Sequence, residues 1–189
     1  DKDLKNNLGG ESGAWNLNPV YEDEANAEIK IAKLKGPDKK KTRALKITYD
    51  VDSPAQAQNG FWTKLRGLDA SIYDTVEFDV RGSKLKGSTS IFKIEIKKYK
   101  DKDRTELIRG SQAITGLTNQ WQHVELKLNK FTGIMDFGDP AVWQNPSLGR
   151  KDLEEFVVVF KDRQVDKKVG AIYIDNIKFT QKNNPGPTS

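Results

Sequence analysis

The sequence predicts an all-β protein, a jelly-roll β-sandwich in which two sheets enclose one core. Two observations indicate this fold class. Most apolar segments alternate apolar with polar residues, which is the period of a strand with one face in a core. Turn-forming Gly, Pro, Asn, Asp and Ser residues separate these segments, and many short strands with such turns favour a sandwich over alternating strands and helices. The 189 residues suit a single domain, which we expect to span residues 1–180.

Nine segments have the strand pattern. They are Glu28–Leu34, Ala44–Val51, Gly60–Leu65, Thr75–Arg81, Ile91–Tyr99, Glu106–Ile114, Gln122–Leu128, Phe156–Lys161 and Gly170–Phe179. Their predicted core sides include Phe92, Ile94 and Ile96 on one strand and Val124, Leu126 and Leu128 on another. No segment is convincingly helical; Lys151–Phe156 could form one turn at most, so we expect a loop or a turn of helix there.

The last predicted strand changes phase along its length. Ile172 and Ile174 share one face, whereas Ile177 and Phe179 are one residue out of step with them. A single extra residue in a strand has this effect. The sequence therefore predicts a β-bulge at Asp175-Asn176.

Charge and composition exclude several partners. The chain has 32 basic and 27 acidic residues and a formal net charge of +5, with the two signs interspersed. Proteins that bind nucleic acid usually concentrate cations on one face, so we expect no nucleic acid partner and interpret Lys39-Lys40-Lys41 as a solvated loop. No apolar stretch approaches the roughly 20 residues that cross a bilayer, and the polar start is no signal peptide, so no membrane insertion is expected. The absence of cysteine excludes thiolate metal sites and cysteine nucleophiles.

Residues 181–189 have the composition of a linker. They contain two prolines, and residues 183–189 offer no apolar side chain that would anchor them to the core. We expect a domain that is tethered to other modules in a longer protein.

Catalytic motifs are weak in this sequence. The single histidine, His123, lies in mid-strand on the polar side, where we expect an exposed or partner-bonded ring instead of a general base. Glu95, Asp136 and Glu154 are candidates for the carboxylate pair of a glycosidase, but 27 acidic residues offer many such pairs. No serine-hydrolase elbow or phosphate-binding glycine loop occurs. We expect that the chain is not an enzyme.

Aromatic residues near strand ends and in loops carry the main functional signal. They are Trp15, Phe61, Trp62, Tyr99, Trp121, Phe137 and Trp143. Sugars have apolar C–H faces that stack on such rings, while polar neighbours bond their hydroxyls. Because adjacent residues of a strand point opposite ways, one ring of the pair Phe61 and Trp62 is predicted to be structural, and Trp121 is predicted to be structural too.

Several short motifs, taken in order, carry a family resemblance. They are Asn7-Leu8-Gly9-Gly10-Glu11-Ser12-Gly13-Ala14-Trp15, Gly60-Phe61-Trp62, the strand from Tyr73 to Arg81, Trp121-Gln122, and Tyr173-Ile174-Asp175-Asn176-Ile177. In these motifs the chain resembles the galactose-binding-like jelly rolls over about residues 7–180. It is similar in particular to family 11 carbohydrate-binding modules and to the domain of complex I intermediate-associated proteins.

The resemblance implies a ligand-binding concave sheet face. Family 11 modules bind mixed-linked and β-1,4 glucans there through tyrosines and carboxylates. Motif matching places Phe61, Asp136, Phe137, Glu154 and Phe160 at these positions, and the loop ring Trp143 completes the predicted set. Three tyrosine positions hold phenylalanine, and the arginine expected two residues before Asp136 is Ile134, so the family's glucan specificity does not carry over.

The resemblance also implies structural calcium. The acid of the Ile-Asp-Asn motif is a calcium ligand in many such modules, and Asp175 is the matching position. The usual N-terminal glutamate matches Gly9, with Glu11 close by. Asp175 and Glu11 are therefore the predicted Ca²⁺ ligands.

Together these observations predict a non-catalytic module that recognises an extended β-glycan and belongs to a secreted protein, extracellular or periplasmic. The alternative is a protein-interaction or assembly domain on the same sandwich fold, as in the complex I-associated relatives.

Overall fold

A computed structural model describes residues 4–17, 26–99, 103–104, 107–135 and 148–182. These residues form eleven strands and one short 3-10 helix. The elements are β1 (Ser12–Leu17), β2 (Ala27–Lys35), β3 (Lys41–Asp50), β4 (Gln58–Leu68), β5 (Thr75–Gly82), β6 (Phe92–Tyr99), β7 (Leu107–Ile114), β8 (Gln122–Lys127), η1 (Leu128–Lys130), β9 (Thr132–Met135), β10 (Leu153–Lys161) and β11 (Val169–Thr180).

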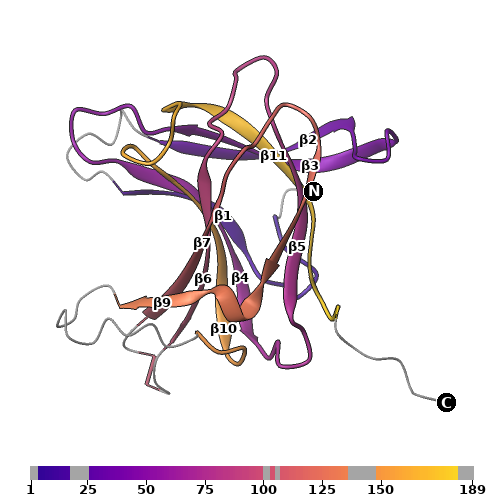
Figure 1. Cartoon of the computed structure of the whole chain (residues 1–189), viewed down its shortest axis with the longest axis vertical. Helices are drawn as coiled ribbons and strands as arrows, with labels where there is room; N and C mark the ends of the chain where they lie inside the picture. The colour runs from indigo at the N-terminus through magenta and orange to yellow at the C-terminus, as the bar shows by residue number, and fades with distance from the viewer. Residues whose placement is uncertain (1–3, 18–25, 100–102, 105–106, 136–147, 183–189) are drawn as a thin grey trace.

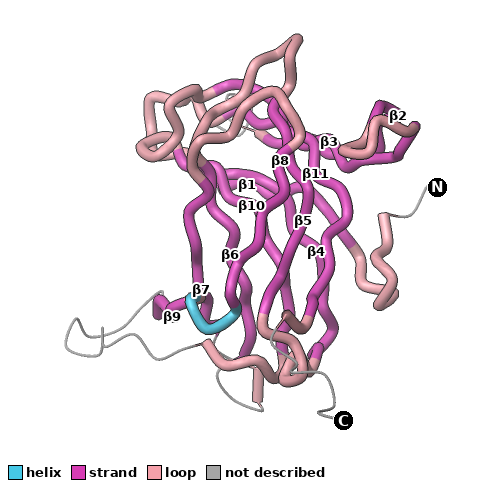
Figure 2. Tube along the Cα trace, turned by 45° about the vertical axis from the view of Figure 1, so that its right-hand side comes forward, coloured by secondary structure: helices cyan, strands magenta, loops and turns pink. Residues whose placement is uncertain are grey.

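The strands form two antiparallel sheets that pack as a jelly-roll sandwich. The six-stranded sheet has the order β1-β4-β10-β6-β7-β9, and the five-stranded sheet has the order β2-β3-β11-β5-β8. Most neighbours in each sheet are distant in sequence, so the fold depends on long-range pairing. Figures 1 and 2 show the two layers and the β2–β3 hairpin, which projects sideways from the body of the sandwich.

The core lies between the sheets and follows the alternation of the strands. Phe92, Ile94 and Ile96 of β6 are buried on one side, as the sequence predicts, and Val80 and Phe78 of β5 face them from the other sheet's core side. Alternate residues point away from the core. Each sheet therefore has an outer face on which polar and aromatic side chains can meet a ligand.

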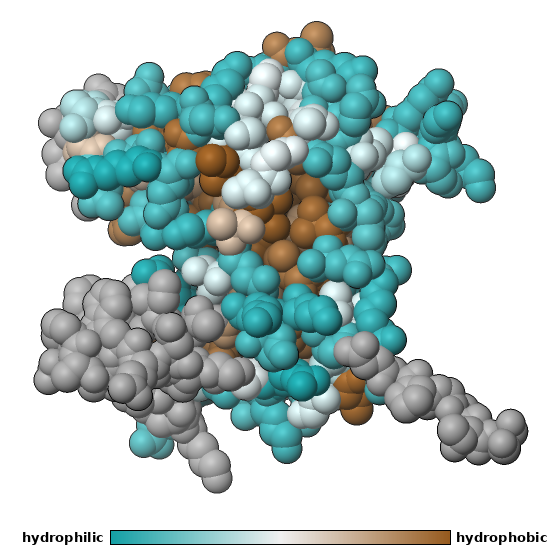
Figure 3. Space-filling model, viewed as in Figure 1, coloured by the Kyte–Doolittle hydropathy of each residue, from teal (hydrophilic) through white to brown (hydrophobic). Residues whose placement is uncertain are grey.

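The sandwich is open along one side, between β7 and β8. The short strand β9 pairs only with Ile108–Ser111 of β7, so the last residues of β7 have a neighbouring strand, β6, on one side only. A hollow of about 280 Å³ opens there, with Val80, Ile114 and Val124 in its lining. Figure 3 shows the apolar side chains in this hollow.

The nine predicted strands are all present, with boundaries that differ by a few residues. Two further strands, β1 and β9, were not predicted. The predicted bulge is confirmed, because the β5–β11 register shifts between Asp175 and Lys178 and Asn176 has a φ of 56°. Of the loop or turn of helix expected at 151–156, the structure has a loop at residues 151–152, and β10 begins at Leu153, directly after Asp152, which has a φ of 58°.

Candidate functional site

The outer face of the six-stranded sheet carries two tryptophans and a row of charged side chains. On β4, Phe61, Thr63 and Leu65 are buried toward the other sheet. The intervening residues, Trp62 and Lys64, are half-buried and project from the outer face.

Trp62 lies against the backbone of the neighbouring strand. It pairs in register with Gly13 of β1. A Cβ atom on Gly13 would come within 2.8–3.0 Å of three atoms of the indole, so only glycine leaves room for the ring. The ring therefore covers the β1 backbone instead of standing upright from the sheet.

Trp15 of β1 crosses β4 in the opposite direction. It pairs with Gly60, and its Nε1 donates a hydrogen bond of 3.3 Å to the carbonyl of Val158 on β10. Gly60 has a φ of 155°, and a Cβ there would lie 1.9 Å from the same Val158 oxygen. The two Trp–Gly pairs thus let both indoles lie flat against the backbone at the β1 edge of the sheet.

Ion pairs continue this face toward the centre of the sheet. Lys64 of β4 and Lys97 of β6 both pair with Glu155 of β10, the latter at 3.6 Å. One strand further, Arg109 of β7 lies 3.7 Å from Glu95 of β6. We call Trp15, Trp62, Lys64, Lys97, Glu155, Glu95 and Arg109 the tryptophan face. It offers flat apolar rings beside carboxylates and ammonium groups that can bond hydroxyls.

Glu154, a predicted ligand residue, lies at the bulged start of β10. Its carboxylate is almost fully buried and pairs with Arg104 at 3.1 Å. The Arg104 guanidinium in turn lies 4.4 Å from the centre of the Tyr99 ring. Glu154 thus sits beside the tryptophan face with its charge already balanced. Asp136, Phe137 and Trp143 lie outside the described residues.

The structure corrects the predicted roles of Phe61 and Phe160. Phe160 is fully buried and stacks on Tyr49 of the opposite sheet, and Phe61 is 4% exposed and borders an apolar cavity of about 540 Å³ between the sheets. Both rings point inward, so neither can stack on a sugar at the outer face. The ring exposed from the pair is Trp62.

Asp175 lies in β11 of the five-stranded sheet, whereas Glu11 lies just before β1 of the six-stranded sheet. Asp175 accepts a 2.7 Å hydrogen bond from the Thr42 hydroxyl and a 2.9 Å bond from the Asn176 amide. Glu11 is exposed just before β1, where its carbonyl accepts the Lys64 amide. Within the described ranges neither carboxylate belongs to a group of three or more metal-ligating side chains. Calcium at these residues stays a prediction.

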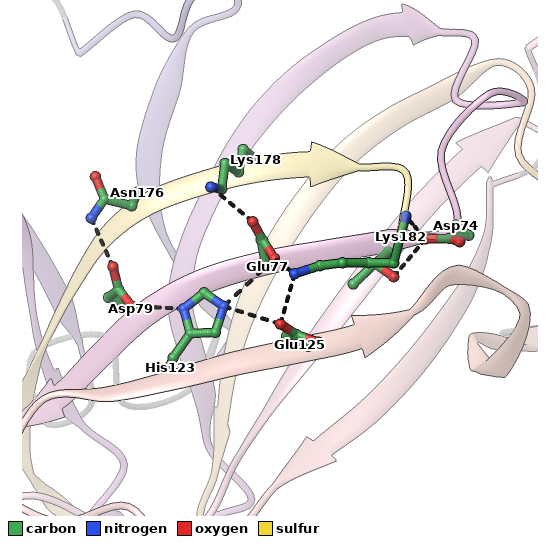
Figure 4. Close-up of polar contacts among 9 residues, drawn as sticks. Asp74, Glu77, Asp79, His123, Glu125, Asn176, Lys178 and Lys182 are labelled. Atoms are coloured by element: carbon green, nitrogen blue, oxygen red, sulfur yellow. Dashed lines mark hydrogen bonds and ion pairs between the residues drawn. The ribbon is translucent and has the colours of Figure 1, made fainter. Parts of the chain in front are cut away.

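A separate polar cluster lies on the outer face of the five-stranded sheet (Figure 4). The ligand atoms of Glu77, His123 and Glu125 lie within 4.8 Å of one another. The Lys182 ammonium, however, is 2.8 Å from a carboxylate oxygen of both Glu77 and Glu125. Lys178 adds a second ammonium at 2.8 Å from Glu77. The cluster is therefore an internally balanced ion-pair network in which a lysine occupies the place of a cation.

These ammonium groups hold the pKa of Glu77 at about 2. His123 bonds Asp79 through Nδ1 at 2.8 Å, and this contact raises the pKa of the imidazole above 6.5. The ring is partner-bonded, as expected from the sequence. Its neighbours are acids and a lysine, an arrangement that stabilises the imidazolium.

The role of the two Trp–Gly pairs was not predicted. Trp15 and Trp62 were among the aromatic residues that the sequence singles out, but their glycine partners, Gly60 and Gly13, lie 45 and 49 residues away along the chain. Only the strand register reveals the pairs. In a sequence, the corresponding signal would be a glycine at the position that pairs, on the neighbouring strand, with an outward-pointing tryptophan.

Comparison with solved structures places the fold among carbohydrate-binding modules. The family 11 module of a cellulosomal cellulase of Clostridium thermocellum matches with a TM-score of 0.65 and 15% identity, covering 95% of this chain and 93% of that chain. A family 11 module from the same organism, in complex with a β-1,3-1,4-mixed-linked tetrasaccharide, matches with a TM-score of 0.63 and 16% identity over 95% and 92%. A family 30 carbohydrate-binding module matches with a TM-score of 0.53 and 17% identity over 82% and 75%.

Neither a family model nor a curated protein sequence matches the chain. No helix in the described part of the chain is long and apolar enough to cross a membrane. At this level of identity the structural matches establish architecture. The chain has the β-sandwich fold of family 11 carbohydrate-binding modules.

Proposed function

We propose that the chain is a non-catalytic carbohydrate-binding module that binds an extended β-glycan along the tryptophan face. The observation that carries this proposal is the pair of indoles, Trp15 and Trp62, each lying over a glycine of the neighbouring strand on one outer face. The fold of the carbohydrate-binding modules supports it.

The geometry suits stacking on sugar rings. An indole that lies against a backbone exposes its other side to solvent, and a pyranose can place its apolar C–H face there. The glycines and the Trp15–Val158 hydrogen bond fix the rings before a ligand arrives, which lowers the entropy lost on binding.

The ion pairs beside the rings supply polar contacts. Glu155 can accept hydrogen bonds from sugar hydroxyls, and Lys64 and Lys97 can donate them. Because each of these charges is neutralised by a neighbour, the face suits an uncharged glycan. Binding along a sheet face also leaves both ends of an extended chain free, as a polysaccharide requires.

We further propose that the module is extracellular or periplasmic and is tethered to other modules. A structural neighbour that belongs to a cellulosomal cellulase supports this location. Polysaccharide ligands would be present outside the cell.

The test is calorimetry and affinity electrophoresis with mixed-linked β-glucan, xyloglucan and mannan. Trp62→Ala and Trp15→Ala should each weaken binding by on the order of 2 kcal/mol, the scale for a central aromatic contact. Trp121→Ala, on the other sheet, is the matched control and should bind as the wild type does. A wild type that binds none of these glycans, or tryptophan variants that bind normally, would reject the proposal and favour the protein-interaction alternative.

A further inference from the structure

Five side chains form one row across the outer face of the five-stranded sheet. Lys30 of β2 pairs in register with Lys46 of β3, which pairs with Tyr173 of β11, and Tyr173 pairs with Arg81 of β5. Trp121 directly precedes Gln122, whose partner is Val80, so it continues the row at β8. We call these five residues the cation–aromatic row.

From Lys46 to Trp121, cations and rings alternate along this row. The Arg81 guanidinium lies between two rings, 4.8 Å from the centre of Tyr173 and 5.5 Å from the centre of Trp121. The Lys46 ammonium lies 5.9 Å from the same Tyr173 ring. Trp121 is fixed in turn, since its Nε1 donates a 2.8 Å hydrogen bond to the carbonyl of Lys35. The rings thus hold two long cationic side chains in place, which removes part of the entropy cost of binding an anion.

The cations of the row are not neutralised. Within the described residues, no carboxylate forms an ion pair with Lys30, Lys46 or Arg81, and the Arg81 Nε is shielded from solvent without a hydrogen-bond partner. On the tryptophan face, by contrast, each lysine named there has a glutamate partner. A partly desolvated guanidinium without a carboxylate gains strongly from an external anion.

The neighbouring acids are already occupied. Asp79 and Asp175 form the next cross-strand pair along β5 and β11. Asp79 is bonded by His123 and by the Asn176 side chain, and Asp175 by Thr42. These hydrogen bonds engage both carboxylates with partners outside the row.

Further cations extend the charge along the projecting hairpin. Lys33, Lys35 and Lys41 border a groove of about 820 Å³ at the end of β2 and β3, and none has an ion pair among the described residues. Figure 3 shows the hairpin as a mostly hydrophilic projection. The Lys35 carbonyl bonds Trp121, so the base of the hairpin turn is fixed to the β8 end of the row. The row alone presents three cations, Lys30, Lys46 and Arg81, on separate strands of one face, which matches a polymer with repeated anionic groups better than a single ion.

We propose that the cation–aromatic row is a second glycan site, which binds an anionic polysaccharide through its carboxylate or sulfate groups. Arg81, Lys46 and Lys30 pair with successive anionic groups of the chain. Nucleic acid fits the row less well, because single-strand binders stack bases on free ring faces, whereas Tyr173 has a cation near its ring on both neighbouring strands. The site lies on the opposite sheet from the tryptophan face and does not depend on it.

The test measures binding of the whole chain to polygalacturonate, dextran sulfate, single-stranded DNA and neutral β-glucan over a range of salt concentrations. Polygalacturonate and dextran sulfate separate carboxylate from sulfate as the preferred group. We expect binding of at least one that weakens as salt rises, and an affinity lowered on the order of tenfold in Arg81→Gln and in Lys46→Gln. Neutral β-glucan binding should not change in these variants, and Trp62→Ala should leave polyanion binding intact.

Lys84→Gln removes the same charge from an exposed loop and is the matched control. Melting temperatures of all variants show that each is folded, and Lys46→Gln keeps the test valid if Arg81→Gln is unstable. An equal loss in Lys84→Gln, or no loss in either row variant, would overturn the site. Tighter Arg81-dependent binding of DNA than of either polysaccharide would overturn the ligand class.

Discussion

Tyr49 and Phe160 stack face to face across the core, with ring centres 3.9 Å apart and an angle of 12° between their planes. Tyr49 comes from β3 of the five-stranded sheet and Phe160 from β10 of the six-stranded sheet, so the pair joins the two layers. The Thr89 amide donates to the Tyr49 hydroxyl at 2.5 Å, and burial raises the pKa of Tyr49 to about 12. Phe160 is therefore a structural residue, held among partners in the core.

Phe160→Ala should destabilise the fold without altering the glycan affinity of the folded protein. Removing a fully buried ring costs roughly 3–5 kcal/mol, because apolar contacts are lost and a cavity remains. Urea denaturation measures the loss, and Trp62→Ala is the comparison, with stability nearly kept and glycan affinity reduced. A Phe160→Ala protein of normal stability that fails to bind glycan would contradict this assignment.

The misassigned rings show where sequence reasoning stops. Alternation shows that a strand has two faces, but it does not show which of two adjacent aromatic residues points outward. A shift of one residue in the assignment exchanges the two faces. Around Phe160 the run of β10 is apolar on both sides, since Val157, Val158 and Val159 are all buried. A run that is apolar at every position does not show which residues face the core. The bulge at Asp175, by contrast, was predictable because the phase change is visible in the sequence.

The two unpredicted strands lack any pattern to detect. β1, with the sequence SGAWNL, has no apolar alternation, and β9 has only four residues. Both lie at the edges of the six-stranded sheet and exist because a neighbouring strand offers free hydrogen-bonding groups. The tryptophan face depends on β1, so its geometry could not be foreseen.

Gly60→Ala should disrupt the tryptophan face. A Cβ at this position would lie 1.9 Å from the Val158 carbonyl oxygen and 3.2 Å from Trp15 Nε1, and the φ of 155° is one that side chains rarely adopt. We expect a lower melting temperature and weaker glycan binding. Gly116→Ala is the control, because its φ of 71° carries a strain cost but no atom lies within 4 Å of the new Cβ. Similar losses in both variants would show that backbone strain alone is responsible.

Calcium remains to be tested at Asp175. If the ion is part of the fold, a chelator should lower the melting temperature of the wild type, since a ligand that binds only the folded state stabilises it. Asp175→Ala should then show no further decrease with chelator, while Asp38→Ala, in the exposed hairpin turn, should respond as the wild type does. A melting curve of the wild type that chelator leaves unchanged would rule out structural calcium.

His123 should make stability fall as the pH rises above 6.5. Its pKa is raised above the ordinary 6.5 by the hydrogen bond with Asp79 and by the nearby carboxylates of Glu77 and Glu125. The stabilisation is therefore fully present below pH 6.5 and is lost as the pH rises through the higher pKa of the folded protein. Melting temperatures measured from pH 5 to pH 9 should decline less in His123→Asn than in the wild type. Parallel curves would exclude the imidazolium as a stabilising group.

Glu77 should make stability fall in acid. The carboxylate is buried, and its bonds to Lys178 and Lys182 lower its pKa from 4.5 to about 2. Its contribution is complete above pH 4.5 and disappears as the pH falls toward 2, because protonation of Glu77 breaks its ion pairs with Lys178 and Lys182. Glu77→Gln should be less stable than the wild type at neutral pH and should lose less stability between pH 4.5 and pH 2 in urea titrations. Glu28→Gln, which removes an exposed carboxylate from β2, is the control and should follow the wild-type profile. If Glu77→Gln kept the wild-type acid dependence, the network of Figure 4 would not be what holds β5, β8 and β11 together in acid.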